Sequence, residues 1–324
     1  MRLARWKTAI GIGFLVAVLS VPVYADTDKH SATPGTVNYI EGQVSVGNQS
    51  LDSKAVGSVG LQAGESLATQ SGKAEILLTP GVYVRLGSNS SIKMISSNLT
   101  DTQLALNQGE AMVEVDEIHP QNNIRISQPG GDTRVLKTGL YSFDASNNNM
   151  KVFDGRASVE ANDREVTVKG GHELALNTDG KLKAQGFDKK RVEQSDDLYR
   201  WSSLRSEYLS QANTETARAY VANGWYGPGW FGPGWYWNPW SGGFTFLPAD
   251  GFLFSPFGWG FYSPLVIYKV PIPARSVPHH FDGSRPAPAI GSGFHDHAVR
   301  AFNGPPPMAR MHSAPLPPPP PIHR

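Results

Sequence analysis

Apolar and polar residues alternate along much of the chain between residues 35 and 185. Val82, Val84 and Leu86 would lie on one side of an extended strand, and Tyr83 and Arg85 on the other. The same period of two recurs at residues 111–115 and 166–168. Alternation of this kind is typical of strands with one face against a core, so the pattern predicts many short β-strands.

Glycines interrupt these apolar runs at uneven intervals. A loose pattern of apolar residues flanking a glycine recurs around Gly42, Gly64, Gly81, Gly109, Gly139, Gly155 and Gly171. Glycine adopts positive φ without a steric penalty, so each is a predicted turn, with Asp154-Gly155 as a two-residue hairpin. The predicted fold class is mainly β: a β-roll or sandwich of two facing sheets over residues 35–186. Since the alternation is complete within residues 35–185, this region is predicted to fold without the rest of the chain.

A helix is predicted over residues 188–213, which contain neither proline nor glycine. Trp201, Leu204 and Tyr208 fall near helical spacing and would share one face, with Arg205 largely outside it. We expect that face to pack on the β-domain or on the segment that follows. Contact with a separate partner is the alternative.

The chain changes character over residues 220–271. A five-residue repeat places Gly-Pro-Gly between aromatic residues, and six of the eight tryptophans fall between Trp225 and Trp259. Gly-Pro-Gly is expected to break regular structure between Trp225, Trp230 and Trp235, because a period of five matches neither a strand nor a helical face. Proline also breaks any membrane-spanning helix in this segment. The rings either pack into a lobe, form a stacking surface for sugar rings, or mediate self-association or membrane contact. The candidate binding residues are Trp225, Trp230, Trp235, Trp237 and Trp240.

Residues 272–324 form a low-complexity tail rich in proline and histidine. Such a composition cannot bury enough apolar surface to offset chain entropy, so the tail is predicted to be disordered, with polyproline II structure in its final proline run. Its histidines are irregularly spaced and are predicted to be solvated, so neither a metal nor another cofactor is expected.

The first 25 residues have the features of a secretory signal. Arg2, Arg5 and Lys7 precede an apolar stretch at residues 9–19, and a small-x-small site ends at Ala25. An uncleaved anchor is the alternative, although the stretch is shorter than the ~20 residues of a spanning helix. The sequence therefore predicts an exported, periplasmic or secreted protein without a transmembrane helix in its mature form.

Charge and cysteine content restrict the possible partners. Residues 1–25 hold three basic and no acidic residues, so the remainder carries 26 Lys and Arg against 28 Asp and Glu. A balance of this kind excludes the clustered positive charge that nucleic-acid binding needs. The chain has no cysteine, and therefore no disulfide or thiolate metal site.

Four carboxylates lie close together in sequence: Glu110, Glu114, Asp116 and Glu117. Paired acids are the groups that glycoside hydrolysis requires. Because Glu110 and Glu114 lie on a predicted strand whose alternate positions are Ala111, Val113 and Val115, a solvated strand face is the preferred interpretation. No nucleophile elbow or phosphate loop is present, so the chain is predicted not to be an enzyme.

An ordered series of segments resembles the FecR-like domain. It begins with Gly-Thr-Val-Asn-Tyr-Ile-Glu-Gly-Gln-Val-Ser-Val at residues 35–46 and spans roughly residues 35–180. The other matching segments are residues 64–78, 80–94, 104–113 and 152–159. The resemblance implies an extracytoplasmic all-β module. The family's namesakes carry signals from an outer-membrane iron-siderophore receptor to a cytoplasmic sigma factor.

This chain departs from the plan of those namesakes, because only about eight residues precede its apolar stretch. We therefore expect the periplasmic module without direct contact to a cytosolic sigma factor. The predicted function is binding or scaffolding in the bacterial cell envelope, with an envelope protein or polysaccharide as partner. The alternatives are a ligand sensor that relays to a separate membrane protein and, third, a carbohydrate-active enzyme.

Overall fold

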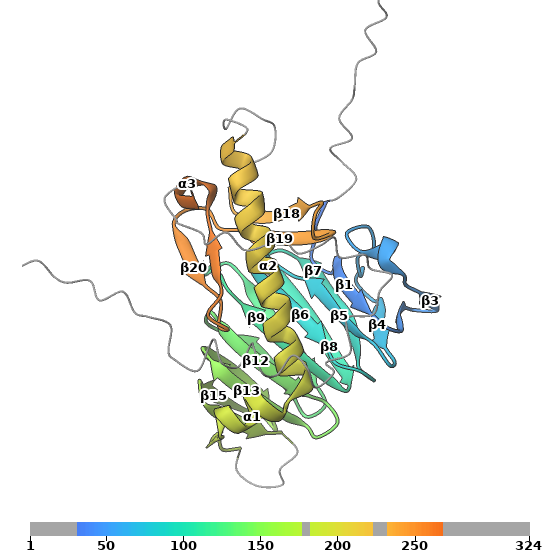
Figure 1. Cartoon of the computed structure of the whole chain (residues 1–324). Coiled ribbons are helices and arrows are strands. Elements are labelled where there is room, and N and C mark those ends of the chain that lie inside the picture. Colours follow the sequence, from blue (N-terminus) through green and yellow to red (C-terminus); the bar gives the residue numbers. More distant parts are fainter. Residues whose placement is uncertain (1–30, 177–181, 223–231, 268–324) are drawn as a thin grey trace, which may run out of the picture.

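The computed structural model of the chain describes residues 31–176, 182–222 and 232–267. These residues form two large β-sheets that face each other, one long helix and two small hairpins (Figure 1). The predicted architecture, mainly β with two facing sheets, is confirmed. The predicted signal segment and the tail at residues 272–324 lie outside the described residues.

Both sheets are built almost entirely from antiparallel neighbours; β8 and β10 form the parallel pair. The eight-stranded sheet has the order β1 (Val37–Glu41), β5 (Lys73–Leu77), β6 (Val82–Leu86), β9 (Glu110–Val115), β12 (Gly139–Asp144), β13 (Asn149–Asp154), β16 (His172–Ala175), β17 (Gln185–Gly186). The nine-stranded sheet has the order β15 (Arg164–Lys169), β14 (Arg156–Ala161), β11 (Gly131–Val135), β10 (Asn123–Gln128), β8 (Asp101–Gln108), β7 (Ser91–Asn98), β4 (Ser66–Thr69), β2 (Val44–Val46), β3 (Gln49–Ser50). A short 3-10 helix, η1 (Ser53–Ala55), follows β3.

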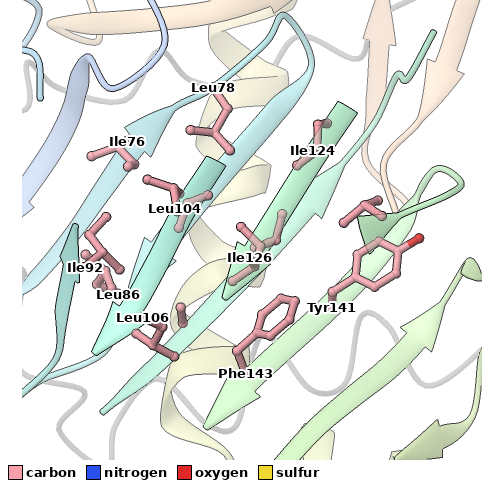
Figure 2. Close-up of a cluster of buried hydrophobic side chains, with 14 of the residues drawn as sticks. Ile76, Leu78, Leu86, Ile92, Leu104, Leu106, Ile124, Ile126, Tyr141 and Phe143 are labelled. Carbon is pink, nitrogen blue, oxygen red and sulfur yellow. The ribbon is translucent and has the colours of Figure 1, made fainter. Parts of the chain in front are cut away.

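The main core lies between the two sheets, as the alternation predicts (Figure 2). Val84 and Val113 face each other in register on β6 and β9, and Leu104 and Ile126 do so on β8 and β10. All four are at most 2% exposed. Complete burial of such a side chain contributes about 1.5–3 kcal/mol, so this inner layer is the principal source of stability.

Several predicted glycine turns are corners at which the chain crosses from one sheet to the other. Gly109 joins β8 of the nine-stranded sheet to β9 of the eight-stranded sheet, with φ +74°. Gly155 likewise joins β13 to β14, with φ +94°, so the predicted hairpin at Asp154-Gly155 is wrong. The two-residue hairpin instead connects β14 to β15 through Asn162 and Asp163, whose φ angles of 51° and 57° meet the requirement of a type I′ turn.

Replacing Gly155 by valine should lower the free energy of unfolding by about 2–4 kcal/mol, because backbone strain and a steric clash coincide. A Cβ at this position would lie 2.4 Å from the Tyr141 hydroxyl and 2.5 Å from the Thr138 carbonyl oxygen. Gly47→Val is the matched control, since Gly47 also has positive φ but has nothing within 4 Å of its Cβ position. Urea denaturation of both variants would test this. Equal losses of unfolding free energy in the two variants would show that the clash at Gly155 contributes nothing beyond backbone strain.

The predicted helical region contains two helices, α1 (Lys189–Ser195) and α2 (Asp197–Ala222). Asp196 separates them and caps α2, because its side chain accepts a hydrogen bond from the Tyr199 amide at 2.9 Å. α2 runs across the outer face of the eight-stranded sheet (Figure 1).

The predicted packing face of this helix is partly wrong. Trp201 is buried, but Leu204 and Tyr208 are 41% and 38% exposed, whereas Arg205 points toward the sheet. The buried face instead carries small polar residues, Ser202, Ser206, Asn213 and Thr216, beside Leu198, Trp201, Leu209, Ala212 and Ala217. Small hydroxyl and amide groups suit this side of the helix because the sheet beneath it is charged.

Two hairpins complete the layer outside the eight-stranded sheet. The first pairs β18 (Gly234–Asn238) with β19 (Gly243–Leu247), and the second pairs β20 (Phe252–Phe254) with β21 (Gly260–Tyr262). A short helix, α3 (Pro264–Ile267), follows. The repeat that was predicted to break regular structure lies largely outside the described residues, and period-two alternation begins after it, within β18. Trp235 and Trp237 pack toward Leu77 and Tyr83 of the sheet, while Tyr236 packs on the other side with Ala217.

Candidate functional site

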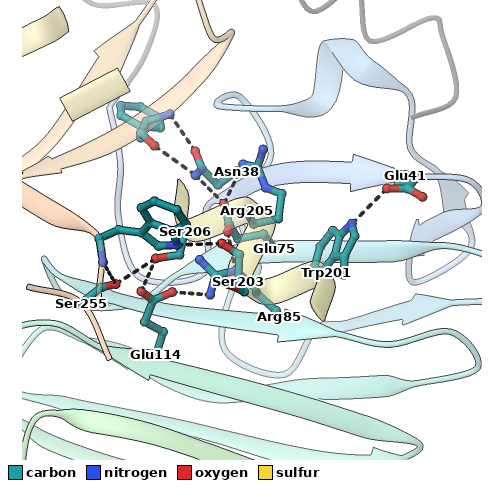
Figure 3. A network of polar contacts seen from close by, with 12 residues as sticks. Asn38, Glu41, Glu75, Arg85, Glu114, Trp201, Ser203, Arg205, Ser206 and Ser255 are labelled. Carbon is teal, nitrogen blue, oxygen red and sulfur yellow. Dashed lines mark hydrogen bonds and ion pairs between the residues drawn. The ribbon is translucent and has the colours of Figure 1, made fainter. Parts of the chain in front are cut away.

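A buried cluster of charged residues occupies the outer face of the eight-stranded sheet (Figure 3). Glu75 on β5, Arg85 on β6 and Glu114 on β9 have side chains that are 0% exposed. Glu75 is the register partner of Arg85, and their side chains meet at 2.7 Å between Nε and Oε2. A second guanidinium nitrogen, Nη1, pairs with Glu114. Three neighbouring strands therefore place one cation between two anions.

The helix above the sheet adds partners to this cluster. Arg205 of α2 donates from Nη2 to Glu75 Oε1 at 3.0 Å, and its guanidinium lies 4.0 Å from the ring centre of Tyr39. Ser206 donates from Oγ to Glu114 Oε1 at 2.6 Å. With both arginines counted, two cations face two carboxylates, and the cluster connects α2 directly to the sheet.

The hairpins are connected to the same cluster. Asn38 of β1 donates from Nδ2 to Glu75 at 2.8 Å and to the Phe244 carbonyl at 3.1 Å, while its Oδ1 accepts from the Phe244 amide at 2.7 Å. Ser206 lies 3.2 Å from Ser255, Oγ to Oγ, between the second hairpin's strands. Hydrogen bonds thus connect α2 and both hairpins to the charged residues.

Electrostatics keep the central groups ionised despite their burial. Burial would raise the pKa of Glu75, but Arg205 and Arg85 outweigh it and lower the pKa to about 2. Burial also disfavours charge on Arg85, yet Glu114 and Glu75 hold its pKa above the usual value. Removing one partner would therefore leave a buried charge without compensation.

Asp116 lies beside this cluster and behaves differently. Burial, and then the negative charge of Glu114, raise the pKa of the Asp116 carboxyl well above its usual value, against the opposing effect of Arg85. As an anion, its two oxygens find no donor among the described residues. Glu114 lies within hydrogen-bonding reach, so the protonated carboxyl can donate to it. The Asp116 carboxyl therefore keeps its proton to a higher pH than an exposed aspartate does.

Two of the five candidate tryptophans pack within the structure. The ring of Trp235 meets Tyr83 edge-on at 4.9 Å, and its Nε1 donates to the Leu78 carbonyl at 3.3 Å. Trp237 meets Phe244 in the same manner at 5.2 Å. Both are half-buried and anchor the first hairpin to the sheet. Trp225 and Trp230 lie outside the described residues.

Trp240 differs, because its side chain is 72% exposed in the turn between β18 and β19. The turn is held firmly: Asn238 Oδ1 accepts from the amides of Trp240 and Ser241, each at 2.9 Å. Asn238 also donates to Thr216 of α2 at 2.9 Å. A large exposed ring on a fixed turn with polar neighbours can stack on a ligand without prior ordering.

The family model of the FecR protein matches residues 65–158, which run from the start of β4 into β14. The predicted resemblance to the FecR-like domain is confirmed over these residues. The match falls inside the predicted span of residues 35–180, and the strands on either side of it extend the same two sheets.

Comparison with solved structures finds two crystal structures of a "putative anti-sigma factor" from Parabacteroides distasonis ATCC 8503. They are 16% and 15% identical to this chain, each with a TM-score of 0.34 over 39% of it, and the chain spans 60% of their length. No curated protein matches.

The charged cluster combines residues of the FecR domain with residues beyond it. Glu75, Arg85 and Glu114 lie within residues 65–158, whereas Arg205 and Ser206 lie after them. Our interpretation of Glu114 as part of a solvated face was wrong, because α2 and the hairpins cover that face. Glu110, at the start of β9, is exposed as expected.

Asp116→Asn should raise the free energy of unfolding at pH 7 by about 1–3 kcal/mol, because folding must either protonate the Asp116 carboxyl or bury it as an anion without a donor. The pKa of Asp116 is raised on folding, so its contribution to stability is complete below the unfolded pKa near 3.8 and is lost as the pH rises through the folded pKa. An asparagine amide can donate to Glu114 at any pH. The gain should therefore shrink as the pH falls toward 4.

Urea denaturation of the wild type and of Asp116→Asn from pH 4 to 8 would measure the difference between their free energies of unfolding. Glu160→Gln is the control, because Glu160 is exposed on β14 of the nine-stranded sheet and should change stability little. A gain for Asp116→Asn that does not vary with pH would show that Asp116 is ionised in the folded protein.

Within residues 31–176, 182–222 and 232–267, no group of three or more His, Cys, Asp or Glu side chains is placed to hold a metal ion. The late histidines of the sequence lie outside these ranges. None of the described helices is long and apolar enough to cross a membrane.

Proposed function

We propose that this chain is an exported, non-enzymatic FecR-like protein that binds or scaffolds a component of the cell envelope, in the periplasm or after secretion. The FecR domain and the signal-like N-terminus support this role. Burial of Glu114 and Asp116 beneath α2 argues against the hydrolase alternative, because a catalytic acid must reach its substrate.

The exposure of Trp240 carries this proposal. Exposed indole rings stack on the apolar faces of sugar rings, and the polar Ser241 side chain beside Trp240 is also exposed. Half-buried Trp235 and Trp237 make contacts within the protein instead. An envelope polysaccharide such as peptidoglycan is therefore the proposed ligand class.

Trp240→Ala should abolish binding of the mature chain to isolated peptidoglycan while leaving thermal stability within about 1 kcal/mol of the wild type, because the ring is mostly solvated. Trp235→Ala is the matched control and should destabilise the protein by about 2–3 kcal/mol, less than a fully buried aromatic side chain because the ring is half-buried. Co-sedimentation with sacculi and urea denaturation would measure the two effects. Unchanged sedimentation of Trp240→Ala would contradict the proposed site.

A ligand sensor that relays to a separate membrane protein is the second candidate, favoured by the presence of the FecR domain itself. It requires a partner in the membrane fraction. Crosslinked pull-down from envelope fractions would separate the two functions: a stoichiometric membrane protein supports the sensor, and recovery of glycan alone supports the binding module.

A further inference from the structure

The second C-terminal hairpin has one apolar face against the protein and a second aromatic face in solvent. Leu253 and Phe261 point inward, and Phe261 is 0% exposed. On the opposite side of β20, Phe252 and Phe254 are 58% and 63% exposed. Two large apolar rings on the outer side of so short a strand are unusual for a surface that contacts only water.

These two rings and Tyr262 form what we call the aromatic platform. Phe252 meets Phe254 edge-on at 5.6 Å and lies 6.1 Å from Tyr262, its register partner on β21, with the ring planes tilted by 33°. The Tyr262 ring extends over Gly260, where a Cβ would come within 2.7 Å of the hydroxyl. The glycine therefore leaves room for the third ring opposite Phe254.

Hydrogen bonds to α2 hold the platform in place. Ser210 donates to the Gly260 carbonyl at 2.7 Å, and Asn213 Oδ1 accepts from the Tyr262 amide at 2.8 Å. Trp259 Nε1 donates to the Ser203 carbonyl at 3.2 Å. The rings thus stand on a preorganised support, so a ligand would not have to order them.

The chemistry of the platform suits proline rings better than sugars. Residues 251–268 contain no charged side chain, and the Tyr262 hydroxyl is the polar group within the platform itself. A sugar needs several hydrogen-bond partners for its hydroxyl groups, whereas polyproline II segments bind to rows of aromatic rings through their apolar edges.

The chain contains such a segment within reach of the platform. Residues 315–321 are prolines apart from Leu316, and residues 297–324 carry three arginines and no acidic residue. The described chain ends at Ile267, five residues after Tyr262. A random coil as long as residues 268–314 has a root-mean-square span of roughly 40 Å, which would give an effective concentration on the order of millimolar.

We propose that residues 315–321 bind in polyproline II form to the aromatic platform of the same molecule. The exposed carboxylate of Asp250, at the entrance to β20, lies where it can attract the basic flanks of the run. The bound tail covers Phe252 and Phe254, so a proline-rich partner must compete with it. This regulation is independent of glycan binding at Trp240.

The absence of cysteine allows a direct test on the full mature chain, because one introduced cysteine labels one site. A nitroxide attached at Ser313→Cys should broaden the amide signals of β20 and β21 about tenfold more than those of β15, given a millimolar effective concentration. The broadening should not change on dilution. A mixture of labelled unenriched and unlabelled isotope-enriched chains should show none.

Two sets of substitutions test the two sides of the contact, the proline run and the aromatic platform. Serine at each of residues 317–321, or Phe252→Ser with Phe254→Ser, should abolish the selective broadening. Ile95→Ser with Leu99→Ser is the matched control, since these residues of the β7 region are 45% and 55% exposed and should leave it unchanged. Absence of broadening in the unaltered chain overturns the proposal. Broadening of β20 and β21 in the mixture as strong as in the labelled chain also overturns it, in favour of contact between two copies.

Discussion

Replacement of Arg85 by methionine is expected to lower the free energy of unfolding by about 3–5 kcal/mol, the usual cost of removing one partner from a buried ion pair. Arg85 stands between Glu75 and Glu114, and all three side chains are 0% exposed. Methionine fills much of the same volume, so the loss is one of charge more than of packing. Urea denaturation at pH 7 would measure it.

Arg205→Met is the matched control, because it also removes an arginine that contacts Glu75. The Arg205 side chain is 13% exposed, and Arg85 still neutralises Glu75 in that variant, so we expect a loss of about 1–2 kcal/mol. A loss below about 1 kcal/mol for Arg85→Met would mean that water reaches the cluster and that it does not secure the outer layer.

The same cluster predicts a specific response to acid. The pKa of Glu75 falls from 4.5 to about 2 on folding, so its stabilising effect is present above 4.5 and is lost as the pH falls through about 2. Arg85→Met removes one of the two cations that lower this pKa, so the variant should lose stability at a higher pH than the wild type.

The inner core could be predicted from local sequence, because period-two alternation needs only one strand to be recognised. Val82, Val84 and Leu86 face the inner layer as expected. The sandwich follows from repetition of that signal, whereas the FecR-like resemblance depends on an ordered series of particular segments. The crossings between sheets at Gly109 and Gly155 could not be predicted, because a glycine with positive φ fits a hairpin and a corner equally well.

The candidate site could not be predicted, because it depends on contacts between residues far apart in the sequence. Arg85 and Glu114 alternate with core residues and therefore resemble a solvated face. The residues that bury them, such as Arg205 and Ser206, follow about 90 positions or more after Glu114. A signal was present: Ser202, Ser206 and Asn213 form a polar stripe at helical spacing, which indicates a helix facing a polar surface.

The covered outer face leads to an expectation that differs from the one drawn from sequence alone. Strand alternation predicts that residues 35–185 fold without the rest of the chain. However, α2 and the hairpins bury a second set of large side chains on the eight-stranded sheet: Leu77, Tyr83, Met112, Leu140 and Phe153. A chain that ends at Gly186 would expose all five together with the charged cluster.

We therefore expect residues 26–186 to lose cooperative unfolding, whereas residues 26–267 should retain it. Each exposed side chain forfeits about 1.5–3 kcal/mol, and five of them together approach the total stability of a typical domain, about 5–15 kcal/mol. Circular dichroism melting and binding of a dye for exposed apolar surface would compare the two chains. A cooperative transition in residues 26–186 within a few degrees of the longer chain would show that the inner core suffices. The two sheets would then fold without the outer layer, and the charged cluster would attach α2 and the hairpins to them without being needed for folding.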